Sequence, residues 1–160
     1  MVGAVAEDRR INRRQQGDLG ELSAMEWLGT QGALVFAPVT HSPHYDLIAD
    51  VDDRLLRVQV KTASFFHRER WEVSICTRGG NLSRSGTTSV FSPERCDLLF
   101  VLVADGRRWC IPAGEVDGRH AVRLGGPKYE RFEIRRGTPF DVRNPPSTPP
   151  PAAFATRLPL

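Results

Sequence analysis

The chain has little of three features that would each define a class of protein. Its 160 residues include only three cysteines, Cys76, Cys96 and Cys110, and no two of them form a C-x-x-C pair. An odd number of scattered thiols among apolar residues predicts buried, reduced cysteines rather than disulfides or a zinc site. No apolar run approaches the ~18 residues that a membrane-spanning helix needs, and the first residues lack the apolar core of a signal peptide. We therefore expect a cytoplasmic protein.

Lysine is also scarce. Of the 22 basic residues, 20 are Arg, and only Lys61 and Lys128 are Lys. An ammonium group can lose or share a proton when its pKa falls from ~10.4, whereas a guanidinium stays charged. Because Arg is the usual cation of this chain, a Lys at position 61 indicates a chemical role. The net charge of +3 and the pI of about 9.1 permit an anionic partner without requiring one.

What is present fits one soluble domain with its own core. Apolar residues make up 40% of the chain and charged residues 26%, which is typical of globular proteins. Residues 1–12 are polar and unpatterned and predict a flexible N-terminus. The folded domain is expected over residues 13–143. Residues 144–160 contain six of the 12 prolines and predict an extended or disordered tail.

Two adjoining strands are the stretch around which the chain is organised. Residues 45–50 and 57–61 both alternate apolar and polar side chains, and Asp50 to Asp53 supplies a turn between them. Period-two alternation places Arg57, Gln59 and Lys61 on one face of the second strand and its apolar residues on the other. A hairpin of this kind can place Asp46 beside Gln59 and Lys61.

A helix is predicted over residues 13–28, with an inward stripe of Leu22, Ala24, Met25 and Leu28. Glu21 would lie on that stripe, where a carboxylate needs a partner. Two accounts of Glu21 are open. It has capping-box spacing from Asp18 and could turn back to the backbone, or it could reach toward Asp46.

Further strands are predicted at residues 33–39, 71–77 and 96–103, the last buried on both faces because it is continuously apolar. A turn at 105–106 leads to a strand at 108–112 and one helical turn at 112–116. The Gly- and hydroxyl-rich loop that begins at residue 78 is best described as a flexible surface loop, and such loops can also contact phosphates. The basic stretch 118–136 suits a nucleic-acid backbone and a solvated edge equally well. The candidate nucleic-acid residues are Arg78, Arg84, Arg119, Arg123 and Lys128. His41 and His44 lack matching metal ligands.

The polar residues of the two strands carry a resemblance. Asp46, a spacer of twelve residues and then Gln59-Val60-Lys61 resembles the PD-(D/E)xK nuclease superfamily, whose motif is an acid, a spacer and acid-x-Lys on adjacent strands. Gln59 stands where the second acid is expected, and no Pro directly precedes Asp46. The Gln-x-Lys order and the Pro-Ala after the strand at 108–112 resemble the intron-encoded homing endonuclease branch. The likeness spans about residues 13–116 and implies an α/β restriction endonuclease-like core with a mixed central β-sheet flanked by helices.

The resemblance also implies a function, a Mg²⁺-dependent (or Mn²⁺-dependent) DNA endonuclease. Its expected catalytic set is Glu21, Asp46, Gln59 and Lys61, and its expected metal ligands are Glu21, Asp46, Gln59 and the carbonyl of Val60. Double-stranded DNA would be the substrate, and cutting both strands needs a homodimer or larger assembly. Homing, restriction, junction-resolving and repair roles stay open. The alternatives are an inactive nucleic-acid-binding module of the same fold, which Gln59 favours, and a small domain that binds an unrelated protein.

Overall fold

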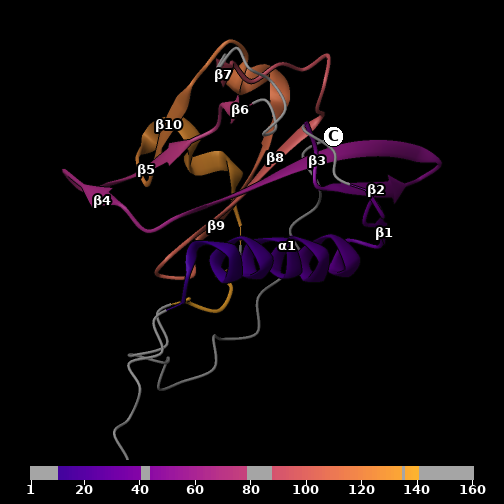
Figure 1. Cartoon of the computed structure of the whole chain (residues 1–160), viewed down its shortest axis with the longest axis horizontal. Coiled ribbons are helices and arrows are strands. Elements are labelled where there is room, and N and C mark those ends of the chain that lie inside the picture. The colour runs from indigo at the N-terminus through magenta and orange to yellow at the C-terminus, as the bar shows by residue number, and fades with distance from the viewer. Residues whose placement is uncertain (1–10, 41–43, 79–87, 135, 141–160) are drawn as a thin grey trace, which may run out of the picture.

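The computed structural model describes residues 11–40, 44–78, 88–134 and 136–140, with the backbone alone at residues 77, 78 and 88. Figure 1 shows a helix lying under a sheet, with a second group of strands above it. The elements are α1 (Arg13–Thr30), β1 (Leu34–Phe36), β2 (Leu47–Val51), β3 (Arg54–Ala63), β4 (Phe66–His67), β5 (Arg70–Ser74), β6 (Thr77–Arg78), β7 (Thr88–Ser89), β8 (Leu98–Val103), β9 (Arg108–Pro112), β10 (Ala121–Leu124) and β11 (Glu133–Ile134), with 3-10 helices η1 (Ala113–Val116) and η2 (Pro127–Phe132).

The central sheet is mixed, as expected. Its six strands run in the order β1-β2-β3-β8-β9-β11, and β3 pairs with β8 in parallel while the other neighbours are antiparallel. The long strand β3 therefore lies between β2 on one side and β8 on the other. Strand β8 is buried at every position, which confirms that the continuous apolar run forms a central strand.

The two faces of the sheet are covered differently. Helix α1 packs on the face that carries Leu47, Val58 and Phe100, and a second cluster fills the opposite face, where Leu99, Val101 and the strands of a three-stranded sheet, β10-β5-β4, meet. Alternation along β3 separates these clusters, so Val58 and Val60 face the helix and Gln59 and Lys61 face the other way. The α/β restriction endonuclease-like architecture is confirmed, with a small sheet and 3-10 helices as the second flank.

Helix α1 corrects two expectations. Asn12 caps it, its side chain accepting from Gln15 N while Gln15 returns a bond to Asn12 N, so the capping box lies six residues before the one considered for Glu21. Leu22 is 61% exposed, and the inward stripe is Gly20, Ala24, Trp27 and Leu28 instead. The stripe runs through a glycine because α1 approaches β3 most closely there.

The thiols follow expectation in part. Cys96 and Cys110 are buried and free, and burial raises the pKa of Cys96 to about 11 and that of Cys110 to about 12. Both are therefore inert structural thiols at neutral pH. Cys76 is also free but only partly buried, so full burial was wrong for this residue. No helix within the described ranges combines the length and apolarity that a membrane span requires.

Candidate active site

Asp46 stands where strand β2 begins and its pairing with β3 ends. The β2–β3 register joins Leu47 to Val58, and the backbone N–H of Asp46 extends it by donating to Val58 O at 2.9 Å. Its carboxylate atom Oδ2 accepts from Val60 N at 2.7 Å and from Gln59 Nε2 at 2.6 Å. A strand N–H lies in the plane of its sheet, so the bond from Val60 N holds the Asp46 carboxylate in that plane. The carboxylate therefore lies just beyond the last β2–β3 pair, where β2 would continue.

Gln59 leaves a buried acceptor beside this carboxylate. The residue is 5% exposed, and its Oε1 accepts no hydrogen bond within the described part of the chain. Burying a carbonyl oxygen without a donor or a cation is costly, and such atoms in native proteins call for an explanation. A half-turn of the amide would exchange Nε2 and Oε1 and direct the oxygen toward the side of Asp46, because the two atoms are equivalent in shape.

The carbonyl of Val60 faces the same edge. Along a strand, backbone polar groups alternate between the two neighbours. Arg57 O accepts from Asp97 N at 2.9 Å on the β8 side, whereas Val58 O accepts from Asp46 on the β2 side. Val60, two residues after Val58, therefore directs its N–H and C=O toward β2. Its N–H meets Asp46, and its C=O lies beyond the last β2–β3 pair.

Glu21 reaches this edge from the helix face. A Cβ added to Gly20 would lie 2.5 Å from Cγ2 of Thr62, so α1 rests directly on β3 just before Glu21. Glu21 and Asp46 line one cleft of about 190 Å³, whose other walls come from residues 37–40 and Tyr45. Partial burial raises the pKa of Glu21, and the nearby charges of Asp46 and Asp18 raise it further. A carboxyl so placed gains from a cation.

Lys61 lies two residues after Gln59 on the same face of β3, and it is partly buried. The Cα atoms of the two residues are separated by about 7 Å, which the side chain of a lysine spans. The described residues that line the cleft of Glu21 and Asp46 do not include Lys61. Glu21 thus approaches the level of Asp46 from the helix face, whereas Lys61 lies on the opposite face of β3.

Three of the expected nucleic-acid residues, Arg119, Arg123 and Lys128, are described, and none of them lines the cleft of Glu21 and Asp46. Arg84 and the side chain of Arg78 fall outside the described residues. Arg119 and Lys128 are exposed, and Arg123 pairs with Glu72 at 3.1 Å. The aromatic residues of the same stretch, Tyr129 and Phe132, are buried in the core, so packing rather than ligand contact explains them.

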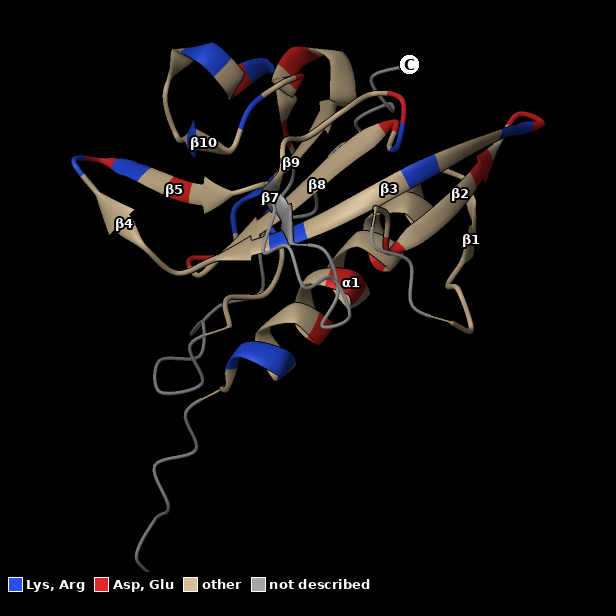
Figure 2. Ribbon diagram, turned by 45° about the horizontal axis from the view of Figure 1, so that its top comes forward, with Lys and Arg blue, Asp and Glu red and all other residues tan. Residues whose placement is uncertain are grey.

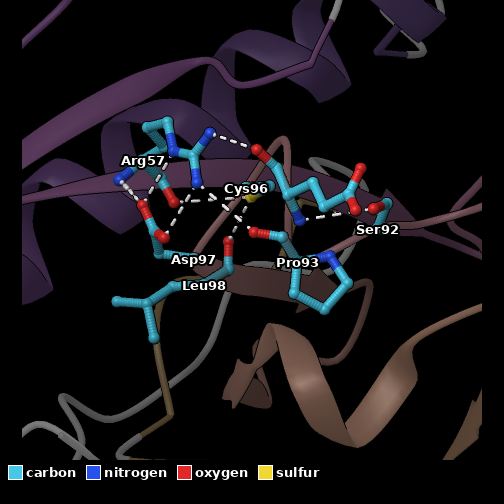
Figure 3. Close-up of polar contacts among 7 residues, drawn as sticks. Arg57, Ser92, Pro93, Cys96, Asp97 and Leu98 are labelled. Carbon is cyan, nitrogen blue, oxygen red and sulfur yellow. Dashed lines mark hydrogen bonds and ion pairs between the residues drawn. The ribbon is translucent and has the colours of Figure 1, made fainter.

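Figure 3 shows a group of polar contacts that the sequence analysis missed. Arg57 Nε donates to Asp97 Oδ2 at 2.9 Å, its Nη2 to Oδ1 at 3.0 Å and its backbone N to Oδ2 at 2.7 Å. The same guanidinium bonds the carbonyls of Pro93 and Glu94. This arrangement fastens β3 to the start of β8. In the sequence, the only sign of this contact is that Asp97 directly precedes the apolar run of β8.

The donor set fits a hard divalent cation. Two carboxylates, a buried amide and a backbone carbonyl are oxygen ligands of the kind that Mg²⁺ and Mn²⁺ prefer. Among the residues the structure describes, no three His, Cys, Asp or Glu side chains gather as a metal cluster. The physical reason is position 59, where an amide takes the place of a third acid. The pair of acids therefore depends on neutral oxygens to complete a site.

Comparisons with known proteins agree with this geometry. The sequence profile of the PD-(D/E)XK endonuclease family matches residues 11–132. Among solved structures, a bacterial homing endonuclease, I-Ssp6803I, is similar in fold, with a TM-score of 0.57 and 18% identity over 76% of this chain and 86% of the other. No curated protein matches the chain. The matched range contains Glu21, Asp46, Gln59 and Lys61.

Proposed function

Because the chain belongs to the PD-(D/E)XK endonuclease family, we propose that it hydrolyses phosphodiester bonds of double-stranded DNA with Mg²⁺, or Mn²⁺, held at Asp46. The observation that carries the proposal is the contact of one Asp46 oxygen with both Val60 N and Gln59 Nε2. Those two bonds fix the carboxylate at the end of β2 before any substrate arrives, and such preorganisation is what electrostatic catalysis requires.

Each residue has a defined task in this proposal. Asp46 and Glu21 would hold the cation from within their shared cleft, and the Val60 carbonyl would supply a further oxygen. Turning the amide of Gln59 would add its oxygen but would break the bond from Nε2 to Asp46, so Val60 N would then hold the carboxylate alone. When bound, the cation acidifies a water and offsets charge on the phosphate. Burial and the charges of Asp46 and Asp18 raise the pKa of Glu21, so a cation beside this carboxyl would favour its ionised form.

Lys61 acts from the opposite face of β3. Its ammonium orients the attacking water or stabilises charge that develops on the phosphate oxygens. A guanidinium at this position would be wider and permanently charged, so Lys61→Arg tests whether the proton or only the charge is needed. A homodimer supplies the two sites needed to cut both strands. The inert thiols Cys96 and Cys110 are compatible with the cytoplasm as the working compartment.

Plasmid cleavage tests the proposal. The full chain is incubated with supercoiled DNA and Mg²⁺ or Mn²⁺, with EDTA as the metal-free control, and nicked and linear forms are separated on a gel. We expect metal-dependent conversion that Asp46→Asn and Lys61→Ala abolish. Cleavage that survives Asp46→Asn would refute the assignment of the site.

Gln59 supports a second candidate, a DNA-binding module that has lost catalysis, because the site holds one acid fewer than the motif. Salt-dependent binding of duplex DNA without cleavage in either metal would establish that function instead.

A further inference from the structure

The hairpin that follows the candidate active-site strand exposes its aromatic residues. Strands β4 and β5 pair Phe66 with Trp71 and His67 with Arg70. Phe65 is 60% exposed and Phe66 is 53% exposed, and the rings of Phe65 and His67 stack with centroids 6.0 Å apart and 15° between their planes. Exposed, preordered aromatic rings of this kind mark a contact surface rather than a core.

The turn of this hairpin holds two charged residues, Arg68 and Glu69, in a backbone conformation that long side chains disfavour. Arg68 and Glu69 both adopt positive φ, 46° and 59°, a region that suits Asn, Asp and Gly far better than long side chains. The β2–β3 hairpin has the same turn, and there Asp52 and Asp53 occupy it with φ of 51° and 61°. Figure 2 shows the β2–β3 tip red and the β4–β5 tip with blue and red side by side. Two turns of one backbone shape thus differ in charge, because Arg68 and Glu69 stand where the other turn has two aspartates.

Arg70 is held in place directly after the turn of the same hairpin. Its guanidinium lies directly on Gly126, where a Cβ would collide with Nε and would lie 2.8 Å from Cζ. Its Nη1 donates to Glu69 O at 2.8 Å, and it lines a cleft of about 220 Å³ with Arg107. Arg107 pairs with Glu133 at 2.7 Å, and Glu130 also lines this cleft. Arg70 is therefore a fixed cation beside the aromatic residues.

We propose that the β4–β5 hairpin enters the major groove of the DNA duplex on which the active site acts. This inference rests on the proposed function, since it needs duplex DNA as the partner. A two-stranded ribbon fits that groove, where Phe65 contacts the base edges while Arg68 and Arg70 contact phosphates. Phe65 follows Lys61 by four residues, about 13 Å of strand, so one duplex reaches both.

Equilibrium binding separates this role from a general basic surface. The Asp46→Asn chain serves as a cleavage-deficient parent, and its affinity for a fluorescent duplex is measured by anisotropy from 50 to 200 mM salt. We expect Phe65→Ala and Arg68→Ala each to weaken binding by about tenfold. Only Arg68→Ala should lower the slope of log affinity against log salt, by about one.

The β2–β3 hairpin supplies the matched controls. Leu55 is 67% exposed, and Arg54 follows the acidic turn. Leu55→Ala and Arg54→Ala should bind within twofold of the parent. Circular dichroism verifies that every variant is folded. If the Phe65 variant binds DNA as tightly as its parent, this inference is overturned while the proposed function stands. A smaller oligomer with unchanged DNA affinity also overturns it, because the hairpin would then contact a second copy of the chain. A parent that binds no duplex overturns the proposed function and this inference together.

Discussion

Two aspartates flank strand β3 from opposite edges and bind it in the same way. Asp46, on the β2 side, accepts from the backbone N of Val60 and from the Gln59 amide. Asp97, on the β8 side, accepts from the backbone N of Arg57 and from the Arg57 guanidinium. Each carboxylate thus accepts from one backbone N–H and one side chain of β3, and Arg57 donates to Asp97 through both Nε and Nη2. The side-chain donor is neutral at Asp46 and a cation at Asp97.

That difference separates a structural carboxylate from a candidate catalytic one. The hydrogen bond from Arg57 lowers the pKa of Asp97, so this pair is satisfied within the fold. Near Asp46 the trend is opposite, because burial and the charges of Asp46 and Asp18 raise the pKa of Glu21. Glu21 and Asp46 thus share the β2 edge of β3, whereas Arg57 pairs with Asp97 at the β8 edge. We expect a cation from solution to bind at the first edge.

Exchanging each aspartate for asparagine should separate the two roles most strongly. Asp46→Asn keeps the size of the side chain but removes the charge that holds the metal, so we expect cleavage to fall by about 100-fold or more. Asp97→Asn should retain cleavage per folded molecule. Initial rates of plasmid nicking at saturating Mg²⁺, normalised to folded protein, measure both. Similar losses in the two variants would erase the functional distinction between the carboxylates.

Gln59→Glu sharpens the comparison by giving Asp46 an anionic neighbour. Three carboxylates bind a divalent cation more tightly than two, and we expect Mn²⁺ affinity to rise by about tenfold. Without metal the added charge repels Asp46 and Glu21, so the variant should be less stable than the parent in EDTA. Calorimetric titration with Mn²⁺ and thermal unfolding in EDTA test the two effects. Unchanged Mn²⁺ affinity would remove position 59 from the ligand set.

Arg57→Ala removes the cation that pairs with Asp97. The variant loses the hydrogen bonds from the guanidinium to Asp97. The side chains of Arg57 and Asp97 are 34% and 32% exposed, so solvent screens the pair and we expect the free energy of unfolding to fall by about 1–2 kcal/mol at pH 7. The folded pKa of Asp97 is lowered. Its contribution is therefore present above the ordinary carboxyl pKa and is lost as pH falls through the folded value. Urea unfolding at pH 7 and at pH 3 should show the difference between variant and parent shrink in acid.

Glu21→Gln should have the smallest effect, with the opposite sign. The folded pKa of Glu21 is raised, so the ionised group opposes folding as pH rises through that value, and its replacement should slightly stabilise the metal-free protein at pH 7. The advantage should vanish below the ordinary carboxyl pKa. Added Mg²⁺ should stabilise the parent more than the variant, because a ligand is missing. Melting temperatures in EDTA and in Mg²⁺ measure this reversal. Equal Mg²⁺-induced shifts would place Glu21 outside the site.

Periodicity predicted the elements on which the site depends. Alternation along β3 separates Val58 and Val60 from Gln59 and Lys61, and the core clusters confirm that division. The continuous apolar run gave β8, and the short turn after Asp50 gave the β2–β3 pairing that places Asp46 opposite Gln59. These features are local, so a pattern over ten residues contains them.

Long-range contacts were beyond that method. The buried face of α1 was misplaced because Gly20, a residue with no side chain to count as apolar, sets the closest approach to β3. The bonds between Arg57 and Asp97 join residues 40 apart in sequence, and neither residue type predicts its partner. The exposed aromatic pair of Phe65 and His67 was assigned only to a connection, because exposure is a property of the folded surface.

The sequence by itself determined which residues could do chemistry: one aspartate before a strand, a Gln-x-Lys within the next, and a lysine where the chain otherwise uses arginine. Only the tertiary structure decided where they lie, with Asp46 held at the level of the sheet, Glu21 beside it from the helix face and Lys61 on the opposite face of β3. The reason is that side-chain direction along a strand is fixed locally, whereas the packing of a helix on that strand and the end of its pairing depend on the whole fold.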